Sequence, residues 1–400
     1  MTLLVAEHPD LATAPELAGV DSTPLRHLCV VQANVSVPDA SVATRLLDEL
    51  AANLAEVGLR PGLCVPDGAG SYLCGFSVRL VKGPWTEWRD DDYWSPRWQE
   101  EVTCPSSLRT MSTKRDNEFP AFAEDVDRSR HETDLVVLLE SDDPTLVGEA
   151  LAMLRHQLPG LRTHTGLAHP EGREPLGFKD GLSNHQAVRS ECPDDYRDLL
   201  LSEEHGEEGT YLAFRRYRLF PERLVDGVPL EVRDSDGDPT RHLTPEQIVG
   251  RCRPCGGVVD RDSGEHLDDE ADHAQASRAP LQSHIVKANP RGRGVTNFGH
   301  QVVVPRARIV RRSYPLDEGS EAGLLFLAFQ SDIQNLGFEY IHNEWLLSDF
   351  NGAPDPLMTP EAGLVEPQTG CYYFLPVDQQ HPGAAFARAC FPHLREGARP

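Results

Sequence analysis

The chain has 400 residues, of which 39% are apolar, and its formal net charge at pH 7 is −25. This length and apolar content suffice for a folded core, which argues against a disordered chain. The acidic excess repels phosphate backbones and anionic lipid, so we expect neither nucleic acid nor a membrane surface as a partner.

Residues 1–24 are expected to form a loose leader, because they contain acids and prolines and no basic stretch before an apolar run. No apolar run in the chain approaches the ~20 residues that cross a bilayer. The nine cysteines are scattered and odd in number, which is more typical of a reducing compartment than of a disulfide framework. These features predict a cytoplasmic protein.

The first half of the chain reads as the element order β-α-β-β-α-β. Apolar residues recur at helical spacing from Val42 to Leu54, and Asp143-Pro144 supplies an N-cap and an N1 proline for a second helix. A Trp-rich insertion with no clear period covers 83–131. Four apolar segments read as strands: 26–36, 72–81, 133–140 and 161–167. This order predicts a ferredoxin-like unit.

The second half can be read in the same way. Strands are expected at 210–219, 301–310, 323–329 and 371–377, with a capping box at Thr244-Pro245-Glu246-Gln247 and a helical stretch at 333–347. The polar segment 256–279 is expected to be an exposed loop. We therefore predict an α+β fold of two ferredoxin-like units with antiparallel sheets. The expected boundaries are 25–190, ending in the loop that holds Asp180, and 191–400.

Two short segments carry the best candidates for chemistry. Gly177-Phe178-Lys179-Asp180-Gly181 presents one acid between two glycines, which allow the backbone to approach a flat ligand. The segment 283–291 holds a single histidine, His284. One acid and one histidine suit a haem, whose iron takes one axial imidazole, better than zinc. Taken singly, Lys-Asp-Gly is also a good turn sequence, and a lone histidine is more often a packed residue.

Several segments together resemble the dye-decolourising peroxidase family, over about Arg26 to Val377. The resemblance includes the Gly-x-x-Asp-Gly pattern at 177–181, the histidine segment 284–291 and the arginine segment 308–312. Similar runs are found at 209–216, 323–326, 344–346 and 355–358. The segment after Asp180 lacks the proline often found in that family, and the segment before His284 lacks its common cysteine. These departures concern the subclass and the substrate.

The resemblance implies a haem b enclosed by two ferredoxin-like units. His284 would be the proximal iron ligand, Asp180 the distal acid–base group and Arg311 the distal guanidinium. Phe178, Gly181, Leu324 and Phe326 would lie against the haem. It further implies a peroxidase that reduces hydrogen peroxide and, through compound I, oxidises dyes, phenols or other small organic reductants. Tyr340 and Trp345 are candidates for relaying electrons at the surface, with packing as their alternative role.

Two other functions stay open. Cys252-Arg253-Pro254-Cys255 with His266 and His273 could form a zinc knuckle in a binding protein, although the histidine spacing exceeds the usual gap. A haem-handling or iron-releasing (deferrochelatase-like) protein would keep the haem but not the peroxidase turnover. The oligomeric state, including a homo-oligomer, is not indicated by the sequence.

Overall fold

The structure is a computed structural model. It describes residues 25–35, 40–62, 70–78, 133–169, 171–179, 196–204, 206–225, 227–230, 241–267, 278–290, 295–297, 300–302, 308–333, 336–347 and 353–390. The expected leader, the Trp-rich insertion, Asp180 and Gly181 lie outside the described residues.

The first ferredoxin-like unit follows the predicted order. It consists of β1 (His27–Ala33), α1 (Ala40–Glu56), β3 (Ser71–Ser77), β4 (Leu135–Ser141), α5 (Pro144–Gln157) and β5 (Arg162–Leu167). Its strands lie in the order β3-β4-β1-β5, and a short β2 (Arg60–Pro61) pairs with β3. Helix α1 turns Leu47, Leu50 and Leu54 into the core, as their spacing predicts. Helix α5 begins where the Asp143 side chain accepts from Thr145 N at 2.8 Å.

The second unit repeats this arrangement with shorter helices. Its strands are β7 (Glu207–Leu219), β12 (Val310–Pro315), β13 (Gly323–Gln330) and β14 (Val365–Pro376), in the order β12-β13-β7-β14. Its helical segments are α8 (Pro245–Val249), α10 (His284–Ala288), α11 (Phe338–Tyr340) and a π-helix, η6 (Ile341–Leu346). The capping box at Thr244 and Gln247 is formed in both directions. The two-unit α+β fold is thus confirmed.

Smaller elements surround these two units. They are α7 (Tyr196–Leu200), β6 (Ser202–Glu204), the 3-10 helix η5 (Pro221–Arg223), the hairpins β8 (Val228–Leu230)–β9 (Arg241–Leu243) and β10 (Val295–Asn297)–β11 (His300–Val302), and α12 (Pro382–Cys390). Helix α12 packs against α1. Among the helices of the described residues, none is long and apolar enough to cross a membrane.

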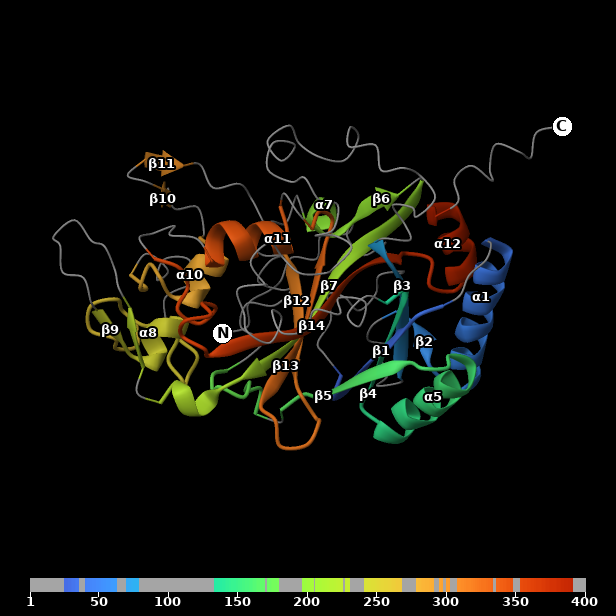
Figure 1. The fold of residues 1–400 in the computed structure, drawn as a ribbon, viewed down its shortest axis with the longest axis horizontal. Helices are drawn as coiled ribbons and strands as arrows, with labels where there is room; N and C mark the ends of the chain where they lie inside the picture. Colours follow the sequence, from blue (N-terminus) through green and yellow to red (C-terminus); the bar gives the residue numbers. More distant parts are fainter. Residues whose placement is uncertain are drawn as a thin grey trace, which may run out of the picture.

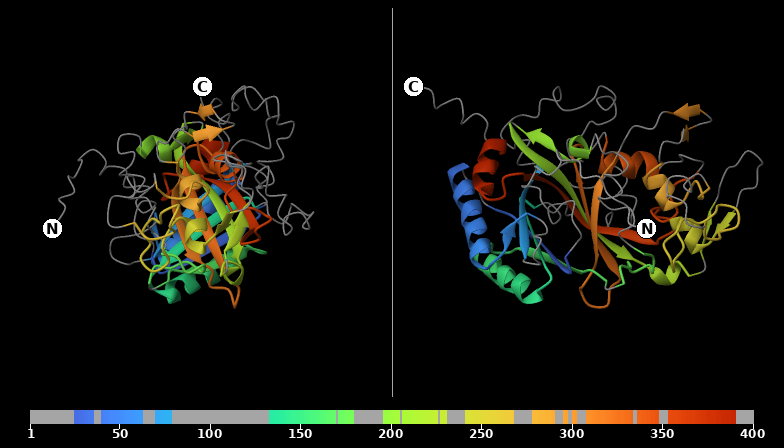
Figure 2. Two further views of the ribbon diagram at one scale, coloured as in Figure 1. Left: turned by 90° about the vertical axis from the view of Figure 1, so that its left-hand side faces the viewer. Right: turned by 180° about the vertical axis from the view of Figure 1, so that it is seen from behind.

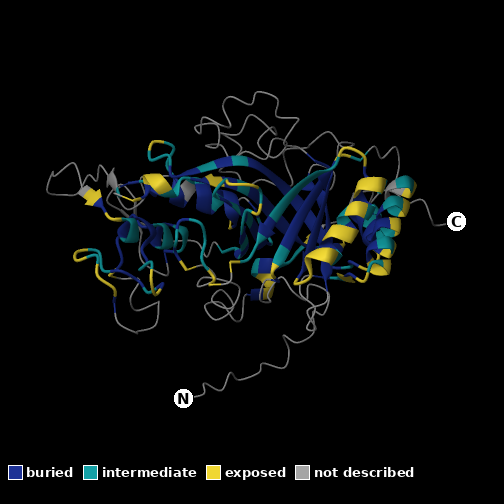
Figure 3. Ribbon diagram, turned by 90° about the horizontal axis from the view of Figure 1, so that it is seen from below, coloured by how far each residue is buried: buried dark blue, intermediate teal, exposed yellow. Residues whose placement is uncertain are grey.

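The two sets of strands form one ten-stranded sheet, because β14 pairs with β3. The strands at the two ends of this sheet, β5 and β12, also approach each other. Gly166, in β5, forms a bridge with Leu316, and Asp317 N donates to Thr165 O at 2.9 Å. Helices α1, α5 and α12 lie at one end of the curved sheet, and α8, α10 and α11 lie at the other (Figures 1 and 2). Figure 3 shows the strands mostly buried and the outer faces of the end helices exposed.

A buried ion pair joins the two units inside this sheet. Arg312, on β12, donates from Nε (2.6 Å) and Nη2 (2.7 Å) to the two carboxylate oxygens of Glu140, on β4. Tyr314 donates to the same carboxylate at 2.5 Å, and burial, followed by the charge of Glu140, raises the pKa of this phenol. Removing one partner would leave a buried charge uncompensated, which is costly.

Two expectations about the second half are wrong. The sheet strand does not run over 301–310: it begins at Val310, and residues 300–302 belong to the separate β10–β11 hairpin. The segment 256–279 is not simply an exposed loop, because Val258, Leu267 and Ala279 pack with Val286 in a small core cluster. Scattered apolar residues between the acids hold its described part against the helix that begins at His284.

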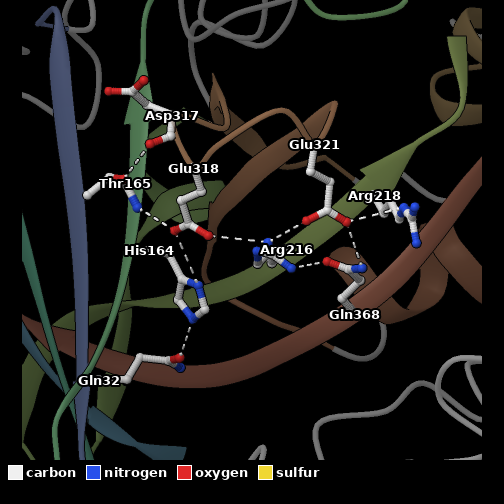
Figure 4. Close-up of polar contacts among 9 residues, drawn as sticks. All are labelled: Gln32, His164, Thr165, Arg216, Arg218, Asp317, Glu318, Glu321 and Gln368. Atoms are coloured by element: carbon white, nitrogen blue, oxygen red, sulfur yellow. Dashed lines mark hydrogen bonds and ion pairs between the residues drawn. The ribbon is translucent and has the colours of Figure 1, made fainter.

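A second polar cluster spans the seam between β5 and the β12–β13 turn (Figure 4). Arg216 binds Glu318 (3.2 Å) and Glu321 (2.9 Å), and the Glu318 carboxylate also accepts from Thr165 N at 2.9 Å. His164 lies 3.2 Å from Gln32 Oε1 and 3.9 Å from Glu318. Burial, assisted by the guanidiniums of Arg216 and Arg162, lowers the pKa of His164 to about 4. The carboxylate nearby does not reverse this shift, because its charge is already shared with Arg216.

The lowered pKa of His164 predicts that the fold is less stable in acid. Between pH 6.5 and about 4 the unfolded chain binds a proton at His164 and the folded chain does not. The free energy of unfolding should therefore fall as the pH is lowered through this window, by up to about 3 kcal/mol from this group. Urea unfolding at pH 7 and pH 4.5 should show a smaller loss in His164→Gln than in the parent. The exposed His381→Gln is the control; equal losses in all three proteins would contradict the prediction.

Candidate active site

His284 is held by a buried carboxylate. Its Nδ1 lies 2.7 Å from Oδ2 of Asp355, which is fully buried, while the histidine side chain is 23% exposed. An ionised carboxylate accepts the proton of Nδ1, so the lone pair of the neutral imidazole lies on Nε2. A histidine held in this way is well suited to coordinate a metal, because the carboxylate fixes the ring and raises its basicity.

Local structure fixes Asp355 in turn. Its other oxygen, Oδ1, accepts from Leu357 N at 2.8 Å, and its backbone N–H donates to Leu346 O at 2.7 Å. Lys287, one turn beyond His284, is buried and donates to Ala353 O at 3.0 Å. The short helix α10 and the segment that carries Asp355 are therefore tied together at two points.

The π-helix η6 packs against α10. Such turns occur frequently at functional sites. Just before it, the ring of Phe338 stacks on His342, with centroids 5.5 Å apart and an interplanar angle of 14°. Tyr340 and Trp345 pack edge to face at 5.5 Å. Trp345 is only 3% exposed, so it is a core residue and not a surface relay.

Arg311 shares one face of the sheet with Leu324 and Phe326. In the β12–β13 register, Arg311 lies opposite Ala328, whose face of β13 also carries Phe326 and Leu324. The alternating burial leaves these three side chains partly exposed, whereas Arg312 on the opposite face is buried. This face of β12 and β13 therefore carries Arg311 beside Leu324 and Phe326, and the buried Arg215 of β7 lies opposite Phe326.

Phe178 reaches the same region from a tight turn. Glu174 accepts from Leu176 N (2.7 Å) and Phe178 N (2.8 Å), and Gly177 takes a φ of +92° that favours glycine. Phe178 is 3% exposed and belongs to the core cluster against which Leu324 and Phe326 pack. Ala288, at the end of α10, packs against this cluster too.

The predicted site residues are therefore brought together only in part. Phe178, Leu324 and Phe326 share a cluster with the end of the His284 helix, and Arg311 lies on the same sheet face. Asp180 and Gly181 lie outside the described residues, so their predicted roles stay predictions. The role of Asp355 was missed: its segment stood out in the sequence, but nothing in the chain order links it to His284.

The zinc alternative gains no support from the part of the structure that is described. His273 lies outside that part. Among the described residues, no group of three or more His, Cys, Asp or Glu side chains is placed to hold a metal ion. Cys252, Cys255 and His266 therefore do not form such a group there.

Comparisons with known proteins give one consistent family. The family profile described as "Dyp-type peroxidase, C-terminal" matches residues 171–380. The dye-decolorizing peroxidase msp1 of Mycetinis scorodonius is 27% identical in an alignment 264 positions long that covers 53% of this chain and 51% of that protein. The chain thus matches about half of the length of that curated relative.

Solved structures share the fold. A DyP-type peroxidase of Anabaena sp. aligns with a TM-score of 0.56 at 18% identity, covering 92% of each chain. A variant of Rhodococcus jostii RHA1 DypB in complex with haem aligns with a TM-score of 0.53 at 15% identity, covering 92% of this chain and 97% of that one. At these identities the likeness concerns the fold alone.

Proposed function

The chain belongs to the Dyp-type peroxidase family, and on this premise we propose that it is a haem b-dependent peroxidase. It would reduce hydrogen peroxide and oxidise dyes, phenols or other small organic reductants. The observation that carries the proposal is the 2.7 Å contact between His284 Nδ1 and the buried Asp355. It leaves Nε2 available as the single imidazole ligand that a haem iron takes on one side.

The residues present fit a haem. His284 would hold its iron, and the apolar side chains of Phe178, Leu324 and Phe326, which are grouped in one cluster, would contact the flat ring. The bound haem would supply the iron at which peroxide is reduced and to which the organic substrate gives its electrons. Asp355 would keep His284 in the Nδ1–H form and so maintain a strong donor at Nε2.

The proton chemistry is proposed for Asp180 and Arg311. Asp180 would accept a proton from one peroxide oxygen and return it to the other, as a general acid–base. Arg311 is charged at every working pH, so it would favour the ionised form of a nearby carboxylate and stabilise negative charge on the departing oxygen. Its partly exposed position on the face of Leu324 and Phe326 supports this role.

The test is dye oxidation by the purified, haem-loaded protein with and without peroxide. A haem absorption band with peroxide-dependent turnover is expected. A haem band without turnover would favour the haem-handling alternative, and absence of both haem and turnover would contradict the proposal.

We expect initial rates to be highest near pH 4–5. A distal histidine would be mostly protonated there, whereas an aspartate, with an ordinary pKa near ~3.9, still accepts protons beside an arginine. Asp180→Asn should lose activity throughout, and the exposed Asp198→Asn should behave as the parent. A neutral optimum that is unchanged in Asp180→Asn would mean that another group moves the proton. Initial rates are needed because the His164 cluster lowers stability in the same pH range.

A further inference from the structure

The turn Cys252-Arg253-Pro254-Cys255 is a feature that the peroxidase proposal leaves unused. It follows α8 (Figure 1) and is closed by two backbone hydrogen bonds, Gly256 N to Cys252 O and Cys252 N to Gly257 O, both 2.8 Å. Both cysteines are free thiols, Cys255 exposed and Cys252 partly exposed. The two side chains are neighbours: burial, followed by the adjacent Cys255 thiol, raises the pKa of the Cys252 thiol.

Three other cysteines of the described residues are not accessible to solvent. Cys29, Cys74 and Cys371 are buried, and burial raises the pKa of their thiols to about 12, 12 and 11. Buried thiols that stay protonated are unreactive. Cys255, by contrast, is open to solvent and its sulfur accepts from Gly257 N at 3.4 Å. Among these residues, only the turn offers an accessible pair.

We propose that Cys252 and Cys255 are a dithiol that hydrogen peroxide oxidises to a disulfide, and that this oxidation alters the segment carrying Phe178. In the first step the Cys255 thiolate attacks one peroxide oxygen, the O–O bond breaks, and hydroxide leaves as water after protonation. In the second step the sulfur of Cys252 attacks the resulting sulfenic acid and a second water leaves. Two thiols lose two electrons and two protons, and one peroxide becomes two waters.

Arg173 connects this turn to the candidate active site. Its guanidinium donates to the carbonyl oxygens of Arg253 (2.7 Å) and Pro254 (3.1 Å), both located between the two cysteines. It also donates to Gly177 O at 3.0 Å, in the turn directly before Phe178. The guanidinium of Arg253 itself lies over the Phe178 ring, 5.1 Å from its centroid.

Oxidation must therefore disturb these contacts. The sulfur atoms of two free thiols move together to about 2.05 Å when they form a disulfide. The two residues between them must adjust, and their carbonyls are the ones that accept from Arg173. The hydrogen bonds of the reduced turn would be weakened, and with them the position of Gly177 and Phe178. The fold thus links peroxide exposure to the loop that leads toward Asp180.

The first experiment tests the disulfide without reference to activity. The haem-loaded protein is titrated with hydrogen peroxide and, separately, equilibrated with mixtures of oxidised and reduced dithiothreitol, then alkylated and digested with trypsin. Because proline follows Arg253, the peptide 252–261 should contain both cysteines. We expect oxidation to lower the mass of this peptide by two hydrogens and to protect its thiols from alkylation. Reduced dithiothreitol should reverse both effects. Alkylation of both thiols under all conditions, or irreversible oxidation of Cys255 alone, would overturn the proposal.

Single variants assign the order of the steps. Cys252→Ser should accumulate a sulfenic acid at Cys255 that dimedone labels, and Cys255→Ser should not be labelled at Cys252. Cys371→Ser, which removes a buried thiol, is the matched control and should form the disulfide as the parent does. Labelling of Cys252 instead of Cys255 would overturn the assigned order.

The second experiment tests the connection through Arg173. Hydrogen exchange of the peptide covering 171–179 should be faster in the oxidised parent than in the reduced parent, and unchanged by peroxide in Cys252→Ser. Arg173→Ala should exchange fast in both states, whereas Arg278→Ala, which removes an exposed pair with Asp260, should not. Unchanged exchange in a fully oxidised parent would refute the connection. Both experiments can fail while dye oxidation persists, so they are separable from the peroxidase proposal.

Discussion

His284→Ala is expected to fold and to lose nearly all of its haem. The substitution removes the proposed iron ligand at a partly exposed position, so little packing is lost, and the main cost to stability is the lost partner of the buried Asp355. The haem-to-protein ratio and the haem absorption band after desalting measure the loss of haem. Urea unfolding measures whether the variant is folded. A normal band at normal stoichiometry would remove His284 as the ligand.

Asp355→Asn tests the contact between His284 and Asp355 by changing the carboxylate. It keeps the size of the side chain but removes the charge that accepts from His284 Nδ1 at 2.7 Å. Loss of such a supporting partner typically weakens metal affinity by ~10–100-fold, so haem should be retained but released faster to an acceptor protein. The exposed His381→Ala is the control for both variants. Release at the parent rate would show that Asp355 has only a structural role.

Arg311→Leu is expected to keep its haem and to react with peroxide ~10²–10³-fold more slowly, which is the typical cost of losing a charge-stabilising donor. The side chain is partly exposed on the sheet face of Leu324 and Phe326, so the fold should tolerate leucine. The measurement is the rate at which peroxide changes the haem spectrum after rapid mixing. Arg311→Lys should recover part of the rate because the charge returns, although without the fork geometry.

Substitution of Arg312, the residue after Arg311, should have a different effect. Arg312 is buried and pairs with both oxygens of Glu140. Arg312→Leu should therefore lose stability, by roughly 3–5 kcal/mol for a broken buried pair, and not reactivity per bound haem. If Arg311→Leu reacted with peroxide at the parent rate, the distal assignment would be wrong whatever Arg312→Leu did.

Much of the fold could be predicted from local patterns. The apolar spacing of α1, the fully buried run of β4 and the caps at Asp143 and Thr244 are each encoded within a few residues. Two β-α-β-β-α-β orders follow from them, and the structure has both. The strand placed at 301–310 was wrong because the apolar residues stand before Val310, whereas the strand itself continues through Arg311, Arg312 and Ser313, and only pairing with β13 shows this.

The sequence by itself determined the family and the residue types of the candidate site, because these reside in short contiguous motifs. Tertiary structure alone decided which of them meet. Asp355 is 71 residues from His284, and no local signal pairs them. Strand alternation requires Arg311 and Arg312 to face opposite sides, but which side is the core depends on where Glu140 packs. Such contacts depend on which faces are buried together when distant elements pack, and this information is not contained in any one segment.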